Sequence, residues 1–133
     1  PDAENITLMP KYSNVFLIKG DSGDLLGGTL NILSAHKCTI WLDGHWSGGD
    51  TAKGIDETPL LRELHCIART RRNSHTILID DMRCWTRESV GFDKTDLVNI
   101  VKVINPRYNI SFIDGVDPSG GFFKDDILVA TTL

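Results

Sequence analysis

Several features that would mark a secreted or membrane protein are missing from this sequence. It has only three cysteines, Cys38, Cys66 and Cys84, and no C-x-x-C pair, which disfavours a disulfide framework or a zinc knuckle and favours reduced thiols. No apolar stretch approaches the roughly 20 residues that cross a bilayer. Residues 1–9 are polar and acidic, unlike a signal peptide. These absences predict a cytoplasmic protein without a membrane segment.

Concentrated positive charge and the common catalytic motifs are also missing. The formal net charge is −4, and the only basic run contains Arg69, Arg71 and Arg72. A surface for nucleic acid needs a clustered positive face, so we expect no nucleic-acid partner. The sequence has no H-E-x-x-H, no G-x-S-x-G and no P-loop motif, so none of these catalytic motifs identifies a reaction.

What the sequence does contain is typical of one globular α/β domain. The 133 residues are 41% hydrophobic and 24% charged. Short apolar runs predict strands, and apolar residues at one-face spacing predict helices between them. The strands are expected at 15–18, 39–42, 76–79, 108–113 and 127–130, and the helices at 23–34, after the Thr58-Pro59 start, and after a Thr95 cap.

The order of these elements predicts the architecture. Apolar strands that alternate with helices indicate a mostly parallel sheet covered by helices on both faces. The last two strands, separated by the turn-forming stretch 117–121, are expected to form an antiparallel hairpin. The prediction is therefore a three-layer, Rossmann-like domain with a C-terminal antiparallel hairpin.

Acidic residues follow three of the predicted strands. They stand in Gly20-Asp21-Ser22, in Asp43-Gly44-His45 and in Asp80-Asp81. Because the carboxyl ends of parallel strands meet at one edge of a sheet, where the ligands of such folds bind, we expect a shared cleft there.

The roles of these residues leave alternatives open. Asp21 and Ser22 suit a helix cap as well as a ligand contact. Asp43 precedes a long loop and not a helix, which favours a functional role. The imidazole of His45 suits a general base or a metal ligand, but a surface histidine is equally compatible. The carboxylates of Asp43 and Asp81 could hold Mg²⁺.

Four segments together carry a resemblance to a known family. They are Gly20-Asp21-Ser22, the run WLDGHWSGG at 41–49, Thr58-Pro59-Leu60 and the run ILIDDMR at 77–83. Over roughly residues 3–130, the sequence resembles a group of bacterial class I S-adenosylmethionine-dependent methyltransferase-like proteins. The resemblance implies a seven-stranded sheet whose last strand is antiparallel, with residues 15–19, 38–42 and 76–80 as its third, fourth and fifth strands.

The resemblance also implies roles for individual residues. Asp21, with Ser22 beside it, would contact the adenine of S-adenosylmethionine, and Asp43 would line the cofactor. His45 would be the catalytic base. Asp43, Asp80 and Asp81 match the positions that hold Mg²⁺ in some O-methyltransferases of this fold.

The family's first two strands, with their glycine-rich loop and ribose-binding acid, have no counterpart here. Residues 1–14 hold no G-x-G-x-x-G, so residues 1–133 resemble a single, N-terminally truncated domain. An unpaired third strand would favour a homodimer through that edge. The expected function is methyl transfer to a small molecule or sugar, and the alternative is a non-catalytic binding or interaction domain. A reading frame that continues upstream through the missing strands would favour the enzyme.

Overall fold

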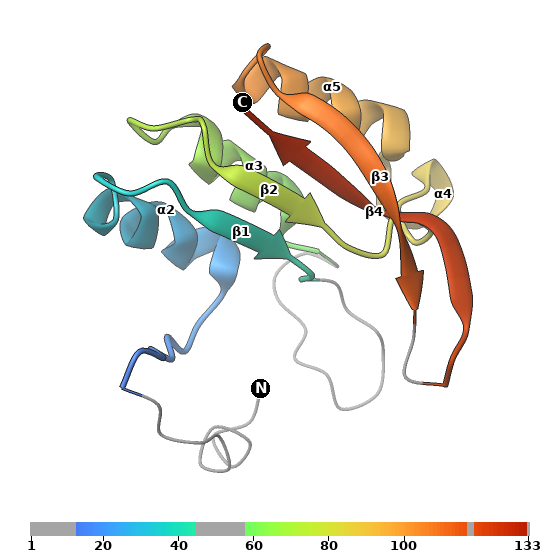
Figure 1. The fold of residues 1–133 in the computed structure, drawn as a ribbon, viewed down its shortest axis with the longest axis horizontal. Helices are drawn as coiled ribbons and strands as arrows, with labels where there is room; N and C mark the ends of the chain where they lie inside the picture. Colours follow the sequence, from blue (N-terminus) through green and yellow to red (C-terminus); the bar gives the residue numbers. More distant parts are fainter. Residues whose placement is uncertain (1–12, 45–57, 117–118, 133) are drawn as a thin grey trace.

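The structure is a computed structural model that describes residues 13–44, 58–116 and 119–132. The elements in chain order are α2 (Ser22–Ile32), β1 (Thr39–Leu42), α3 (Leu60–Ala68), β2 (Thr76–Ile79), α4 (Arg87–Val90), α5 (Lys94–Ile104), β3 (Asn109–Val116) and β4 (Phe122–Thr131) (Figure 1). The predicted α/β class is confirmed. None of the helices in these ranges is long and apolar enough to cross a membrane.

The four strands form one mixed sheet in the order β1-β2-β4-β3. β1 and β2 are parallel, with Thr39 opposite Thr76 and Leu42 opposite Ile79. β4 is antiparallel to both β2 and β3. The predicted C-terminal hairpin is therefore confirmed. The expectation of a mostly parallel sheet is met only in part: β1 and β2 are parallel neighbours, whereas the other two pairings are antiparallel because β4, the second strand of the hairpin, lies between β2 and β3.

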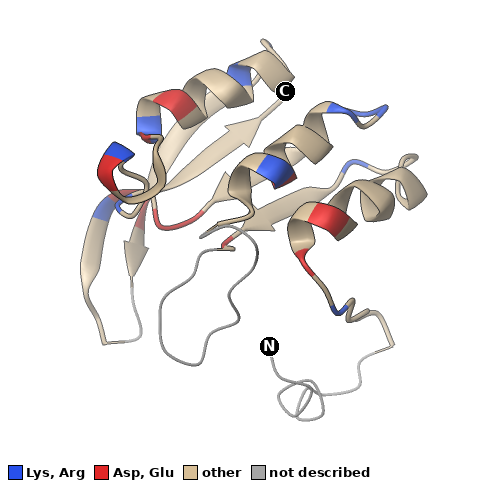
Figure 2. Ribbon diagram, turned by 180° about the vertical axis from the view of Figure 1, so that it is seen from behind, with Lys and Arg blue, Asp and Glu red and all other residues tan. Residues whose placement is uncertain are grey.

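The described helices cover one face of the sheet (Figures 1 and 2). The burial of side chains along β1 agrees with a sheet that is covered on one face. Ile40 and Leu42 are buried, whereas Trp41 between them is 51% exposed. The predicted layer of helices on the second face is not found among the described residues. The part of the fold that the structure describes is a sheet with one helical layer.

The core lies between this helical layer and the sheet. α3 contributes Leu60, Leu64 and Ile67, as its apolar spacing predicts; the same spacing was expected to bury Leu61 on this side, but Leu61 is 42% exposed. α5 contributes a matching apolar face, consisting of Leu97, Val101 and Ile104, and these meet the buried strand residues Ile77, Ile79, Leu128 and Ala130 in one cluster. Burying apolar side chains on facing elements is the main stabilising term of such a domain.

The run predicted as a strand at 15–18 is not one. Its residues form no strand, and Phe16 is 85% exposed and Val15, the least exposed of the four, 47%. Apolar composition alone cannot make a strand, because a strand needs a neighbour for its backbone hydrogen bonds. No described strand pairs with this run. The homodimer through its edge stays a prediction, without the strand on which it was based.

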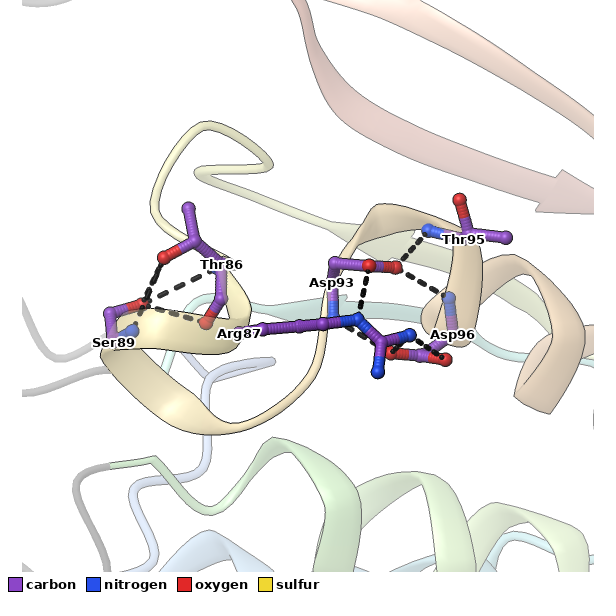
Figure 3. A network of polar contacts seen from close by, with 6 residues as sticks. All are labelled: Thr86, Arg87, Ser89, Asp93, Thr95 and Asp96. Carbon is purple, nitrogen blue, oxygen red and sulfur yellow. Dashed lines mark hydrogen bonds and ion pairs between the residues drawn. The ribbon is translucent and has the colours of Figure 1, made fainter.

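The helix cap predicted at Thr95 belongs instead to Asp93. The Asp93 carboxylate accepts hydrogen bonds from the backbone N–H groups of Thr95, at 2.9 Å, and Asp96, at 3.1 Å (Figure 3). The Asp96 carboxylate in turn accepts from the Asp93 N–H at 3.0 Å, completing a capping box. Both residue types can cap a helix, so composition did not decide between the two positions.

The short helix α4 was not predicted. Thr86 and Ser89 form a capping box around its single turn, and Arg87 reaches Asp93 at 2.7 Å and Asp96 at 2.8 Å (Figure 3). These ion pairs join α4 to the start of α5. They thereby hold the segment that follows β2, which carries two of the predicted site residues.

Substitution of two glycines tests where the helices α2 and α4 lie along the chain. Gly28 lies inside α2, and an added Cβ would meet no atom within 4 Å. Because glycine weakens a helix by about 1 kcal/mol relative to alanine, Gly28→Ala should raise the free energy of unfolding by about that amount in urea denaturation. Gly91 is equally open but has φ +83°, so Gly91→Ala should lower it by about 1 kcal/mol. Equal effects would contradict the helix boundaries.

Candidate functional site

The carboxyl ends of β1 and β2 lie side by side, as predicted for parallel strands. The two strands end in register at Leu42 and Ile79, and the backbone N–H of Asp80 donates to the carbonyl of Leu42 at 3.0 Å. Asp43 and Asp80 therefore begin their loops at neighbouring points. Two polar clusters stand at this edge of the sheet: one follows β2, and the other, called here the cluster after β1, lies beyond the end of β1 at the amino-terminal ends of α2 and α3.

The cluster after β2, called here the triad of aspartates, consists of Asp80, Asp81 and Asp126. One carboxylate oxygen from each lies within 4.8 Å of the others. Asp126 is 2% exposed and comes from β4, which the hairpin places beside β2. The structure thus brings two of the three predicted metal ligands together. The third, Asp43, is exposed and is not a member of this triad.

Arg83 pairs with two of the three carboxylates of the triad. Its guanidinium pairs with Asp81 at 2.7 Å and also contacts Asp126, whose other oxygen accepts the Arg83 backbone N–H at 3.0 Å. Burial acts against the charge of Arg83, but the two carboxylates outweigh it and raise the pKa of the guanidinium. The side chain also lies over the Phe123 ring at 4.1 Å. In this arrangement the guanidinium stands where an Mg²⁺ ion would have to meet Asp81 and Asp126, so the ion would compete with Arg83 for these two carboxylates.

The backbone around the triad is unusual. Asp81 and Asp125 have φ values of 55° and 54°, in the left-handed region that few residues other than glycine adopt. The Asp80 carboxylate accepts from the Asp81 N–H at 2.8 Å and supports the first of these turns. On the other side, a Cβ added to Gly115 would lie 2.8 Å from the Asp126 carboxylate, so only glycine lets β3 approach this closely. Such strained, closely covered positions are common at functional sites.

The cluster after β1 begins with the cap of α2. Asp21 accepts from the Gly23 N–H at 2.8 Å through one oxygen and pairs with Arg62 of α3 at 2.8 Å through the other. The hydrogen bond from Arg62 holds the pKa of the Asp21 carboxyl below its ordinary value, although burial acts in the opposite direction. Of the two roles left open for Asp21, capping is thus observed.

Glu63 is the residue of this cluster that the sequence reasoning missed. It lies on α3, is 3% exposed, and is hydrogen-bonded by the Ser22 side chain. Its Oε2 atom is buried and has no hydrogen-bond partner among the residues that the structure describes, while Oε1 lies 3.7 Å from where a Cβ on Gly44 would stand. Burial raises the pKa of Glu63, and the Ser22 hydrogen bond opposes that shift only in part.

The sequence did carry a signal for Glu63. It stands three residues after Leu60 and four before Ile67, on the face that the apolar spacing assigns to the core. A carboxyl group on such a face is an exception that needs an explanation. His45, the predicted catalytic base, lies outside the described residues, so its placement relative to Glu63 stays untested.

No protein-family model, curated protein or solved structure matches this chain. The geometry of the two clusters is therefore what bears on the function of the chain.

The buried aspartate of the triad provides a stability test. Asp126→Asn removes the negative charge with which Arg83 pairs. A hydrogen bond between charged groups contributes about 2 kcal/mol. We expect the free energy of unfolding to fall by about that amount in urea denaturation. Asp24→Asn is the matched control, because Asp24 also pairs with an arginine, Arg62, but is 66% exposed and should change stability by less than about 0.5 kcal/mol. Equal losses in the two variants would contradict the pairing.

Glu63 predicts a dependence of stability on pH. Because its pKa is raised in the folded state, the protonated group stabilises the fold below its ordinary pKa of 4.5, and that stabilisation is lost as pH rises through the raised pKa. Glu63→Gln should therefore raise the Tm at pH 7–8, by about 4 °C for each 1 kcal/mol relieved. The gain should disappear below pH 4.5, and exposed Glu88→Gln should show no such trend. A gain that is the same at every pH would contradict the buried charge.

Proposed function

We propose that this chain is a methyltransferase-like domain that binds S-adenosylmethionine at the cluster after β1. The acceptor of the methyl group would be a hydroxyl or an amine of a small molecule or sugar. One observation carries the proposal: the buried Oε2 atom of Glu63, to which no described residue donates a hydrogen bond, on a side chain beside Ser22.

A buried carboxylate oxygen without a donor is unfavourable by about 1–3 kcal/mol or more. A ligand that brings a hydroxyl or an amine hydrogen would relieve this. The ribose hydroxyls and the adenine amine of S-adenosylmethionine are donors of that kind, so the residues present fit this part of the cofactor. The resemblance independently assigns Asp21 and Ser22 to the same cofactor. It also assigns Asp43, which directly follows β1, to the lining of the cofactor.

The cofactor, when bound, supplies an electrophilic methyl group. The chain's part is then to orient the cofactor and to accept a proton from the substrate. Glu63, Ser22 and Asp21 would hold the adenosine portion, and His45, which follows Asp43 in the sequence, would be the base. The finer fold that goes with this proposal is the three-layer, Rossmann-like one, and the antiparallel β4 agrees with its last strand.

No metal step is part of this proposal. The triad of aspartates lies after β2, but Arg83 already pairs with two of its three carboxylates. Its role here is structural, because it joins the loop after β2 to β4 through Asp126.

A specific observation favours the alternative, a non-catalytic binding or interaction domain. The run at 15–18 exposes its apolar side chains and forms no strand, whereas the resemblance requires a paired strand before Asp21. A domain of this kind would keep the polar edge and bind a ligand or partner without transferring a methyl group.

Isothermal titration of the chain with S-adenosylmethionine tests the proposal. We expect saturable binding that Glu63→Gln weakens about tenfold, because a charged acceptor is replaced by a neutral one. Glu88→Gln, which changes an exposed glutamate of α4, should bind as the unmodified chain does. Absence of heat at millimolar cofactor would overturn the proposal. Binding that is equal in both variants would remove Glu63 from the site.

A further inference from the structure

The edge of the sheet opposite the two acidic clusters has a charge pattern of its own. It is built from residues 32–39, 67–76, 101–110 and 130–132, which contain the starts of β1, β2 and β3 and the end of β4. These segments contain six of the chain's 14 Lys and Arg residues and none of its 18 Asp and Glu residues. The basic residues are Lys37, Arg69, Arg71, Arg72, Lys102 and Arg107. We call this edge the amino edge. In a chain of net charge −4, all the Lys, Arg, Asp and Glu side chains of these segments are basic.

Helix ends explain only part of this pattern. The carboxyl end of a helix carries partial negative charge, so Arg69 after α3 and Lys102 in the last turn of α5 are favourably placed. Lys37 and Arg107 come later, close to the starts of β1 and β3. These two residues need a different explanation.

Lys37 and Arg107 line the same cleft. Its volume is about 610 Å³, and its other lining residues are Ser74, Asn109 and Thr132. Small-molecule sites typically measure about 300–1,000 Å³, so a ligand of that class fits. All of these described lining residues are either basic or neutral and polar.

Neither of the two basic side chains in the cleft forms an ion pair with an acidic residue that the structure describes. The Lys37 ammonium contacts the carbonyl oxygen of Thr132 at 3.0 Å and its hydroxyl oxygen at 3.4 Å, both neutral. The Arg107 guanidinium makes no ion pair or hydrogen bond with any residue that the structure describes. Ser74 and Asn109 add a hydroxyl and an amide as neutral donors.

We propose that this cleft binds the phosphate group of a small molecule. A phosphate offers several acceptor oxygens, which suit an ammonium, a guanidinium and neutral donors at once. A small ligand is favoured over nucleic acid because the two unmatched charges meet in one cleft and because the chain as a whole is acidic. This site lies at the other edge of the sheet and is independent of the methyltransferase proposal.

NMR titration of the full chain with inorganic phosphate tests the site, with ionic strength held constant by sodium chloride. We expect saturable shifts of the backbone amides of Ser74, Asn109 and Thr132 at up to about 10 mM phosphate. Lys37→Gln and Arg107→Gln, which change exposed side chains, should each weaken binding about tenfold. Lys19→Gln, an exposed lysine before α2, is the charge-matched control and should bind as the unmodified chain does.

Further arms of the titration separate the sources of the phosphate. Tighter binding of adenosine 5′-monophosphate than of inorganic phosphate would identify a phosphate ester as the ligand, and equal binding would identify the free anion. Both outcomes support the site. Absence of saturation, or variants that bind as the unmodified chain does, would overturn it. Preferential binding of a single-stranded oligonucleotide, weakened by Arg71→Gln and Arg72→Gln, would also overturn it, in favour of a nucleic-acid surface.

Discussion

The parallel pairing of β1 with β2 separates the acidic residues that follow these strands from the basic residues that precede them. In that register, both strands begin at one edge of the sheet and end at the other. The carboxylates that follow them are therefore brought together, and the basic residues that precede them are kept at a distance. A shift of one residue would turn Ile40 and Leu42 to the outside and break the core and both polar edges together.

The elements that could be predicted from the sequence are those whose local pattern agrees with their packing. The apolar spacing along α3 and the paired runs before Asp43 and Asp80 are of this kind. The run at 15–18 shows the limit, because its composition suits a strand while its backbone finds no partner. The four residues of α4 lie below the length at which periodicity is visible, and contacts of Thr86 and Arg87 hold them.

The candidate site could be predicted only where its residues follow the strands directly. Asp80 and Asp81 are such residues, and the structure does place them in one cluster. Asp126 is distant in the sequence and joins them only because β4 inserts between β2 and β3. Glu63 is a different case: its place on an apolar face was visible in the sequence, but the neighbours that bury it belong to other elements.

The indole of Trp85 has a consequence for how the site can be observed. Its N–H donates to the carbonyl of Asp80 at 2.8 Å, its ring stacks on Phe92 with centroids 5.8 Å apart, and it is 3% exposed. A dry, hydrogen-bonded indole emits at shorter wavelengths than one in water, such as the half-exposed Trp41. Of the two tryptophans that the structure describes, Trp85 is therefore the one whose blue-shifted emission reports on the loop after β2, without any attached dye.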